Sequence, residues 1–349
     1  MKATHRTIAC IATLAAAAAF NSSASPGSLG GPLELQDEGS FFIGGHPVKS
    51  DRPSNAAAAA PGDIMTAQMY VQYRIPRAAN MPPIVMVHGS GHTGATYETT
   101  PDGREGWATY FARKNFPVYV VDHAGRGRSG FDPTAINRAK TESNAALLPA
   151  DMPLFTRERA WANFRVGPSY PTPFPGVQFP VDSFDQYVSQ LVPNTEATLP
   201  GAGANTVRDL GALLDRVGPA IVLVHSQSGG YGLDLVRQRD DKVRALVVIE
   251  GSCGPLSADD VSKHFKKVPF LTVLGDNTVG SSGPNGDERR KLCNDSVEAI
   301  RAAGGMGRFI VLPDLGIKGN DHMMMMDKNN LQIADLIMAW LAEAAPATQ

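Results

Sequence analysis

The segment AIVLVHSQSGGYG, residues 220–232, places two serines two positions apart where an apolar run meets a glycine-rich turn. A strand that turns tightly into a helix can hold a nucleophilic serine clear of a sheet, with the pattern G-x-S-x-G. Read literally, that pattern puts Ser228 at its centre. Read by position, the run Ile221 to Val224 places Ser226 on the turn and makes Ser228 the small residue that follows. The segment predicts a nucleophile elbow and leaves both serines open, with a plain helix N-cap as the alternative.

Short, unbroken apolar runs alternate with helix-like stretches along the rest of the chain. Unbroken runs of this length are typical of parallel strands that are covered on both faces. The sequence therefore predicts an α/β chain with a mostly parallel central sheet and helices on both faces. The other runs are Ile84 to Val87, Val118 to Val121, Ala245 to Ile249, Phe270 to Leu274 and Phe309 to Leu312, and Met69 to Arg74 is also expected to be a strand. The helix-like stretches are Trp107 to Arg113, Asn205 to Val217, Tyr231 to Arg239, Arg289 to Ala303 and Leu331 to Ala344.

One long stretch, residues 132–204, interrupts this alternation. It is too long for an ordinary connection, and its many aromatic residues argue against disorder. We expect it to form a substrate-binding cap over the strand ends, inserted into a core made of residues 67–131 and 205–349. Residues 25–66, rich in Gly, Pro, Ser and Ala, are expected to form an N-terminal arm with one short strand at Ser40 to Ile43.

The first 24 residues are typical of an export signal. Lys2 and Arg6 precede an apolar, alanine-rich stretch, and the small residues 22–24 offer a cleavage site. The apolar stretch is short for a bilayer span, although a membrane anchor or a disordered tail is an alternative. We expect a periplasmic or secreted protein with no membrane span in its mature part.

Several polar residues follow directly on the apolar runs, where sites form in open α/β sheets. A serine nucleophile needs a histidine to take its proton and an acid to orient that histidine. His322 lies after the last strand, in the chain order nucleophile, acid, base that this kind of fold uses. For the acid, Glu250 closes the strand after the elbow and Asp276 closes the next one. The residues alone do not decide between these two carboxylates.

A serine mechanism also needs backbone N–H groups that stabilise the developing oxyanion. One should come from the residue after the nucleophile, which is Gln227 if Ser226 is the nucleophile. The other should come from Ser90, in the loop His88-Gly89-Ser90-Gly91 that follows an apolar run.

Net charge, the expected mechanism and the cysteine content indicate which partners and cofactors to expect. The formal net charge of −2 gives no basic footprint for nucleic acid. A serine mechanism needs neither metal nor cofactor, so we expect none, and we expect a small-molecule ester or lactone as the partner. A homodimer is open. Cys253 and Cys293, the two cysteines outside the export segment, form a disulfide in an oxidising compartment or remain separate thiols.

With these motifs in view, the chain resembles the α/β-hydrolases, and more narrowly the bacterial esterase 713-like family. The resemblance spans most of the chain after the export segment and is weakest in residues 132–204. The resembling stretches are GSFFIGG, VHGSGHTGATYETTPDGREGWATYFARK, VYVVDHAGRGRSG, VHSQSGG, VVIEGS and GNDHMMMMDKNNLQIADLI.

The resemblance implies an α/β-hydrolase fold with Ser226 as nucleophile, Glu250 as acid and His322 as base. The step from serine to acid is 250 − 226 = 24 residues, which suits two successive strand ends separated by one helix. Adjacent cysteines known from the family stand where this chain has Ser90 and Gly91, so we expect the oxyanion loop to lack that disulfide.

Together these features predict an exported serine hydrolase that cleaves carboxylic esters through an acyl-enzyme. The apolar cap favours a cyclic or aromatic ester or a lactone. The same three residues would also serve an amidase, a carbon–carbon bond hydrolase or an acyltransferase. A non-catalytic binding protein that keeps the fold is a more remote alternative.

Overall fold

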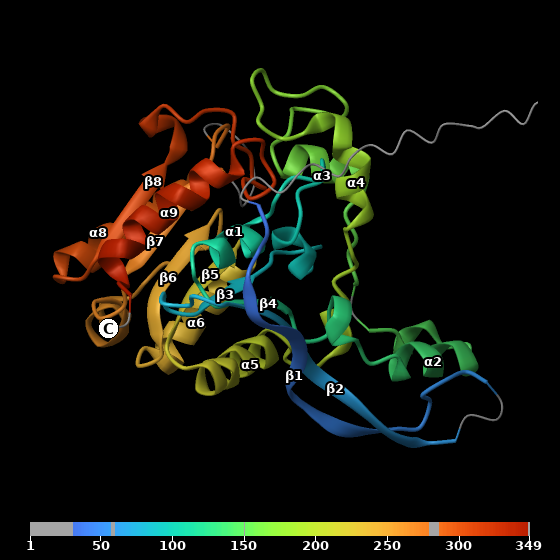
Figure 1. Ribbon diagram of the computed structural model, residues 1–349. Coiled ribbons are helices and arrows are strands. Elements are labelled where there is room, and N and C mark those ends of the chain that lie inside the picture. The colour runs from blue at the N-terminus through green and yellow to red at the C-terminus, as the bar shows by residue number, and fades with distance from the viewer. Residues whose placement is uncertain (1–30, 57–59, 150, 279–285, 348–349) are drawn as a thin grey trace, which may run out of the picture.

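The computed structural model describes residues 31–56, 60–149, 151–278 and 286–347, and one eight-stranded sheet forms its centre. The strands lie in the order β1-β2-β4-β3-β5-β6-β7-β8. From β4 to β8 neighbouring strands are parallel, whereas β2 is antiparallel to both β1 and β4 (Figure 1). The predicted mostly parallel sheet is therefore confirmed. The strands are β1 Leu35–Ser50, β2 Gly62–Pro76, β3 Ile84–Val87, β4 Val118–Asp122, β5 Ala220–His225, β6 Val243–Ile249, β7 Phe270–Leu274 and β8 Gly307–Val311.

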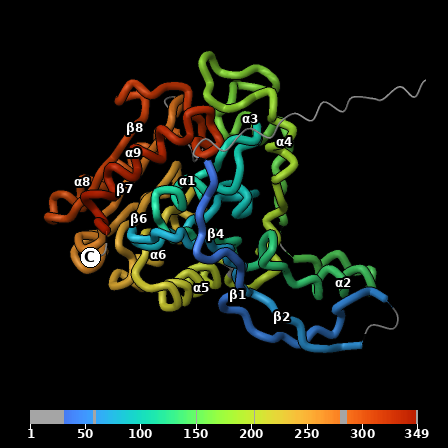
Figure 2. Tube along the Cα trace, viewed as in Figure 1, coloured from blue at the N-terminus to red at the C-terminus, as the bar shows by residue number. Residues whose placement is uncertain are grey.

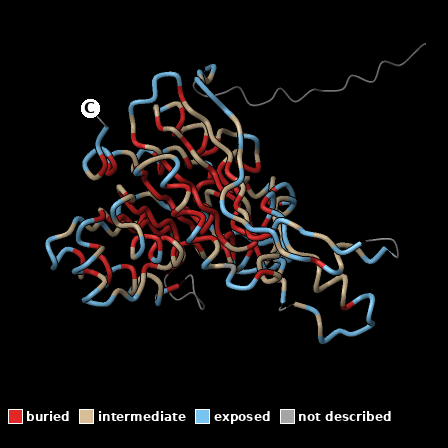
Figure 3. Tube along the Cα trace, turned by 90° about the horizontal axis from the view of Figure 1, so that it is seen from below, coloured by how far each residue is buried: buried red, intermediate tan, exposed pale blue. Residues whose placement is uncertain are grey.

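Helices cover both faces of this sheet, as predicted. The apolar side chains of α1 and α9 join one core cluster, and those of α5, α6 and α8 join the other. The buried residues gather in the middle of the molecule (Figure 3). Strands β3, β5 and β7 are buried at every residue between these two layers. Burial on both faces is why their sequences are almost entirely apolar. The helices are α1 Trp107–Arg113, α2 Thr134–Thr141, α3 Arg157–Asn163, α4 Phe184–Ser189, α5 Ala202–Val217, α6 Ser228–Arg239, α7 Ala258–Asp260, α8 Asp287–Ala302 and α9 Asn330–Ala344.

The strand register brings three loops to one edge of the sheet. Val87 at the end of β3 is paired with Val224 in β5, and Val224 is paired in turn with Val248 in β6. The segments that follow these strands therefore start side by side at the carboxyl ends of the strands.

The segment predicted as an N-terminal arm is different in the structure. In place of one short strand at residues 40–43, β1 spans Leu35–Ser50 and pairs with β2 as a long hairpin. β1 is an edge strand with many solvent-exposed residues, so it lacks the apolar run by which the central strands are predicted. Gly44 and Gly45 adopt positive φ angles of 66° and 75° within it, which residues with side chains rarely adopt.

The insertion at residues 132–204 has two parts. Its first helix, α2, lies beside the far end of the hairpin, where Thr134 Oγ1 is 2.6 Å from Ser50 Oγ (Figures 1 and 2). From α3 onward it lies over the strand ends, and Phe164 O accepts a hydrogen bond from the backbone of His322 at 3.0 Å. The buried aromatic side chains of this second part are Trp161, Phe164, Phe179, Phe184 and Tyr187.

The predicted export signal, residues 1–24, lies outside the described residues. In the part of the chain that the structure describes, no helix is both long and apolar enough to cross a membrane.

Candidate active site

Ser226 lies on the turn between β5 and α6, where a nucleophile elbow would place it. Its φ angle of 54° is in the left-handed region, and backbone strain of this kind gathers at functional sites. The Ser226 N–H donates to Ile249 O at 3.0 Å, which ties the turn to β6. Helix α6 can start this close to the sheet because Gly229 has no Cβ atom, which would collide with the backbone of Ser252. Ser226 itself is only partly buried.

Ser228, the other candidate, is fully buried at the first turn of α6. Its hydroxyl donates to the carbonyl oxygen of His88 and lies 2.8 Å from Nε2 of His123. These contacts hold α6 on the loop after β3 and occupy the hydroxyl within the core. The geometry favours Ser226 as the nucleophile and Ser228 as a packing residue.

Glu250 follows directly on β6 with a φ angle of 51°, and its side chain is fully buried. One carboxylate oxygen, Oε2, lies 3.2 Å from Nδ1 of His322. The other, Oε1, accepts hydrogen bonds from Arg165 Nη2 at 2.6 Å and from Gly275 N at 2.5 Å. Burial by itself raises the pKa of Glu250, but the Arg165 charge and the His322 hydrogen bond lower it by more. The net result is a pKa well below the usual range. Glu250 is therefore ionised at neutral pH.

Asp276, the alternative acid, makes different contacts. Its carboxylate accepts hydrogen bonds from the backbone N–H groups of Asn277 at 2.7 Å and Gly319 at 3.0 Å. These bonds hold the loop after β7 against the loop that carries His322. The structure thus brings Glu250, and not Asp276, to the imidazole ring.

Contacts to the backbone and to the ring hold His322 in position. Its N–H donates to Phe164 O, its carbonyl oxygen lies 3.0 Å from Nε2 of His225, and its ring stacks on the Phe164 ring at 5.4 Å. Because the ionised Glu250 can only accept a hydrogen bond, Nδ1 of His322 carries the proton and Nε2 has the lone pair. That Nε2 atom is buried and has no hydrogen-bond partner among the described residues. Burial lowers the pKa of His322 to about 4, although the hydrogen bond to Glu250 raises it in part.

The two predicted oxyanion donors lie on segments that adjoin Ser226. Gln227 follows it in the chain, and Ser90 lies on the loop after β3. Gly89 lets that loop approach closely, because a Cβ atom there would lie 2.9 Å from Cβ of Ser226. Within the described ranges, no hydrogen bond of the Ser90 or Gln227 backbone N–H is present.

Arg165 and Phe164 are site residues that the sequence reasoning missed. Both come from the insertion, and Arg165 reaches Glu250 across 85 positions of the chain. No local motif marks either residue. The aromatic content of the insertion indicated only that this segment is folded.

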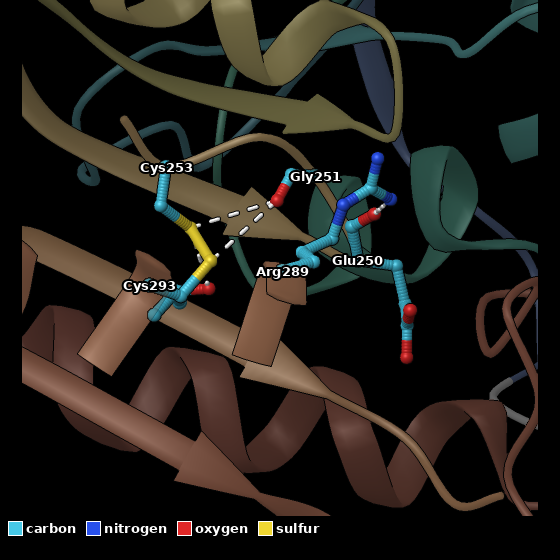
Figure 4. The surroundings of a disulfide bond; sticks show 6 residues. Glu250, Gly251, Cys253, Arg289 and Cys293 are labelled. Carbon is cyan, nitrogen blue, oxygen red and sulfur yellow. Dashed lines mark hydrogen bonds between the residues drawn. A yellow bond between two sulfur atoms is a disulfide. The ribbon is translucent and has the colours of Figure 1, made fainter. Parts of the chain in front are cut away.

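Cys253 and Cys293 form a disulfide that joins the segment after Glu250 to α8 (Figure 4). Both sulfur atoms contact the carbonyl oxygen of Gly251, at 3.5 and 3.6 Å. One turn earlier on α8, Arg289 Nη1 donates to the carbonyl oxygen of Glu250 at 2.5 Å. The cross-link spans 40 positions and is expected to stabilise the fold by about 2–4 kcal/mol. It fixes the backbone on which the Glu250 carboxylate depends.

The described residues hold no group of three or more His, Cys, Asp or Glu side chains that could bind a metal ion.

No family model matches the chain. A solved structure of a bacterial esterase is 41% identical, with a TM-score of 0.84, and the match covers 92% of this chain and 99% of that one. A probable secreted lipase of a fungal species (strain ATCC 74256) is 29% identical over 320 residues, covering 78% of this chain and 85% of the lipase.

Proposed function

This chain is a carboxylic-ester hydrolase of the α/β-hydrolase esterase family, and we propose that it works through an acyl-enzyme on Ser226. The observation that carries this proposal is the contact between Glu250 and His322, together with a left-handed Ser226 that follows the strand paired with the one before Glu250. A nucleophile, a base and an acid that orients the base are the parts that such catalysis needs.

In this mechanism Nε2 of His322 takes the proton of the Ser226 hydroxyl as Oγ attacks the ester carbonyl carbon. The negative charge on the carbonyl oxygen is stabilised by the N–H groups of Ser90 and Gln227. His322 returns the proton to the departing alcohol, and an acyl group remains on Ser226. Nε2 then takes a proton from water as the water oxygen attacks the acyl carbon. The bond between that carbon and Ser226 Oγ breaks, the carboxylic acid leaves, and His322 returns the proton to Oγ.

The aromatic part of the insertion supports an apolar, cyclic or aromatic ester or lactone as substrate. The Phe155 ring packs on the oxyanion loop, where a Cβ atom on Gly91 would lie 2.5 Å from it. Phe155 in turn contacts Phe164, with 5.0 Å between ring centroids, and Phe164 stacks on His322. A continuous aromatic wall thus connects the oxyanion loop to the base. Export is supported by the composition of residues 1–24 and by the name of the secreted lipase relative.

The pH dependence of kcat/KM follows from the pKa of His322. The base must be neutral, and burial lowers its pKa to about 4, so kcat/KM for a non-ionising ester should stay high at pH 5–6 and be halved near pH 4. The profile is measured from pH 3.5 to 8. Enzyme held at each pH and assayed again at pH 7 controls for acid unfolding. An acidic limb at pH 6.5 or above would contradict the proposed environment of His322.

A fluorophosphonate probe tests the nucleophile directly. We expect one equivalent of probe to be incorporated per chain, and mass spectrometry of the digested protein should place it on Ser226. Protein in which Ser226 is replaced by alanine should remain unlabelled, whereas Ser228→Ala should still be labelled. Labelling at Ser228, or none in an active preparation, would overturn the proposal. Matched ester and amide substrates distinguish an esterase from an amidase.

A further inference from the structure

The Gly125-Arg126-Gly127-Arg128 turn after β4 sends one arginine into the site. Arg126 is fully buried, and its guanidinium contacts both sides of the proposed oxyanion hole. Nη1 donates to Gly89 O at 2.9 Å, and Nη2 donates to the side-chain oxygen Oε1 of Gln227 at 3.2 Å. The two acceptors come from different loops, so one rigid group spans the gap between them.

The bond to Gly89 matters because Gly89 O and Ser90 N belong to the same peptide unit. Nδ1 of His88 also lies 2.9 Å from this oxygen. A cationic donor on a carbonyl oxygen polarises the whole peptide, so its N–H becomes a stronger donor on the opposite side. Arg126 contacts the Gly89 carbonyl oxygen, and the Ser90 N–H of the same peptide points in the opposite direction.

The insertion keeps this cation in place. Glu196 forms an ion pair with Arg126, with Oε2 accepting from Nε at 2.9 Å and Oε1 accepting from Nη2. The neighbouring Thr195 donates through Oγ1 to Gly125 O at 2.5 Å. Gly125 permits this approach, since a Cβ atom there would lie 2.9 Å from Cα of Glu196. Arg126 thus has a fixed position as well as a compensated charge.

We propose that Arg126 is a positioning residue for the oxyanion hole. It polarises the Gly89–Ser90 peptide and holds this peptide in a fixed position relative to Gln227. The proposal rests on the proposed function, because it assigns a role in stabilising the same tetrahedral intermediate. It predicts a loss in kcat, since an oxyanion is present only along the reaction path and not in the bound ester.

Arg128 offers a matched control on the same turn. It also makes a strong ion pair, with the buried Asp122 at 2.9 Å, and its guanidinium lies 4.2 Å from the centre of the Tyr70 ring. None of its hydrogen bonds reaches Gly89, Ser90 or Gln227. Arg128→Met therefore removes a structural ion pair without touching the oxyanion groups.

The experiment compares Arg126→Met, Arg126→Lys and the double variant Arg126→Met/Glu196→Met with Arg128→Met. The double variant removes both charges of the ion pair together, which is less disruptive than leaving the buried one unpaired. Arg126→Lys keeps a cation for Glu196 but loses the planar guanidinium that donates to Gly89 and Gln227 at the same time. Steady-state kinetics use p-nitrophenyl butyrate, and inhibition uses a trifluoromethyl ketone, which forms a tetrahedral oxyanion adduct with a serine. All assays are run well below the melting temperature of each variant.

For Arg126→Met and the double variant we expect kcat to fall about 10- to 100-fold, part of the loss typical of a deleted oxyanion donor. KM should change by less than about threefold, and the ketone should bind more weakly in proportion to kcat. Arg126→Lys should fall between these variants and the wild type. Arg128→Met should keep kcat within about threefold of the wild type.

The proposal is overturned if folded Arg126 variants keep kcat within about threefold, if the loss lies in KM alone, or if Arg128→Met loses as much kcat. Should Arg126→Met fail to fold, the lysine and double variants decide. Failure of the proposed function is distinct, because Ser226→Ala would then stay active whatever the arginine variants do. An inactive Ser226→Ala enzyme beside fully active Arg126 variants would reject only the role of Arg126.

Discussion

Replacement of Ser226 by alanine is expected to lower kcat for a chromogenic short-chain ester by about 10⁵- to 10⁶-fold. Without Oγ there is no acyl-enzyme, and the oxyanion groups can only assist direct attack by water. The backbone strain at a φ of 54° is not relieved by alanine, so the elbow should keep its shape. Purified protein is assayed against wild type, with circular dichroism to confirm that both are folded. Retention of more than about one hundredth of the wild-type kcat would reject Ser226 as nucleophile.

Ser228→Ala is the matched control, because it removes the same hydroxyl two positions away. Its loss leaves the His88 carbonyl oxygen and His123 Nε2 without this partner in the core. We expect a cost in the free energy of unfolding of about 1–3 kcal/mol. The kcat of the folded protein should remain within about tenfold of wild type. A reversal of the two results would assign the nucleophile to Ser228, as the literal G-x-S-x-G pattern does.

The second large effect is expected for Glu250→Gln, with a loss in kcat of about 10⁴-fold. A glutamine amide cannot stabilise the imidazolium that forms on His322, and its NH₂ group can bind Nδ1 in the wrong tautomer. The change also leaves Arg165 beside a neutral side chain in a buried site, so the melting temperature should fall as well. Kinetics and thermal unfolding are therefore measured on the same samples.

Asp276→Asn tests the other carboxylate by the same chemical change. Among the described residues the Asp276 side chain accepts from two backbone N–H groups, and an asparagine oxygen can replace one of those contacts. We expect kcat to stay within about tenfold of wild type. A loss near 10⁴-fold for Asp276→Asn, with an active Glu250→Gln enzyme, would exchange the roles of the two acids.

The sheet was predictable because its central strands are buried on both faces. Ile84–Val87 is apolar at every position and Phe270–Leu274 at every position except Thr272, and the structure has strands over these same residues. The α/β-hydrolase fold and the resemblance to bacterial esterases are confirmed by the structural match. The full length of β1 could not be predicted from an apolar run, because this edge strand is held by its pairing with β2.

The site was predictable only in part. The strand ends, which the sequence marks with apolar runs, offer Ser226 or Ser228, Glu250 or Asp276, and His322. The family resemblance selects among these candidates. Arg165 and Glu196 carry no such mark, because their partners lie 85 and 70 positions away. Contacts of that separation depend on how the insertion folds back, and this is decided by packing of the whole chain rather than by any local pattern.

The insertion is often the part of a hydrolase that an engineer would exchange in order to change substrate range. Here that segment contributes the cation beside Glu250, the ring stacked on His322 and the counter-charge of Arg126. A chimera that carries a foreign segment in place of residues 132–204 would lose these contacts to the proposed catalytic residues. Specificity libraries for this enzyme should therefore keep Phe164, Arg165 and Glu196 constant and vary the aromatic positions around them.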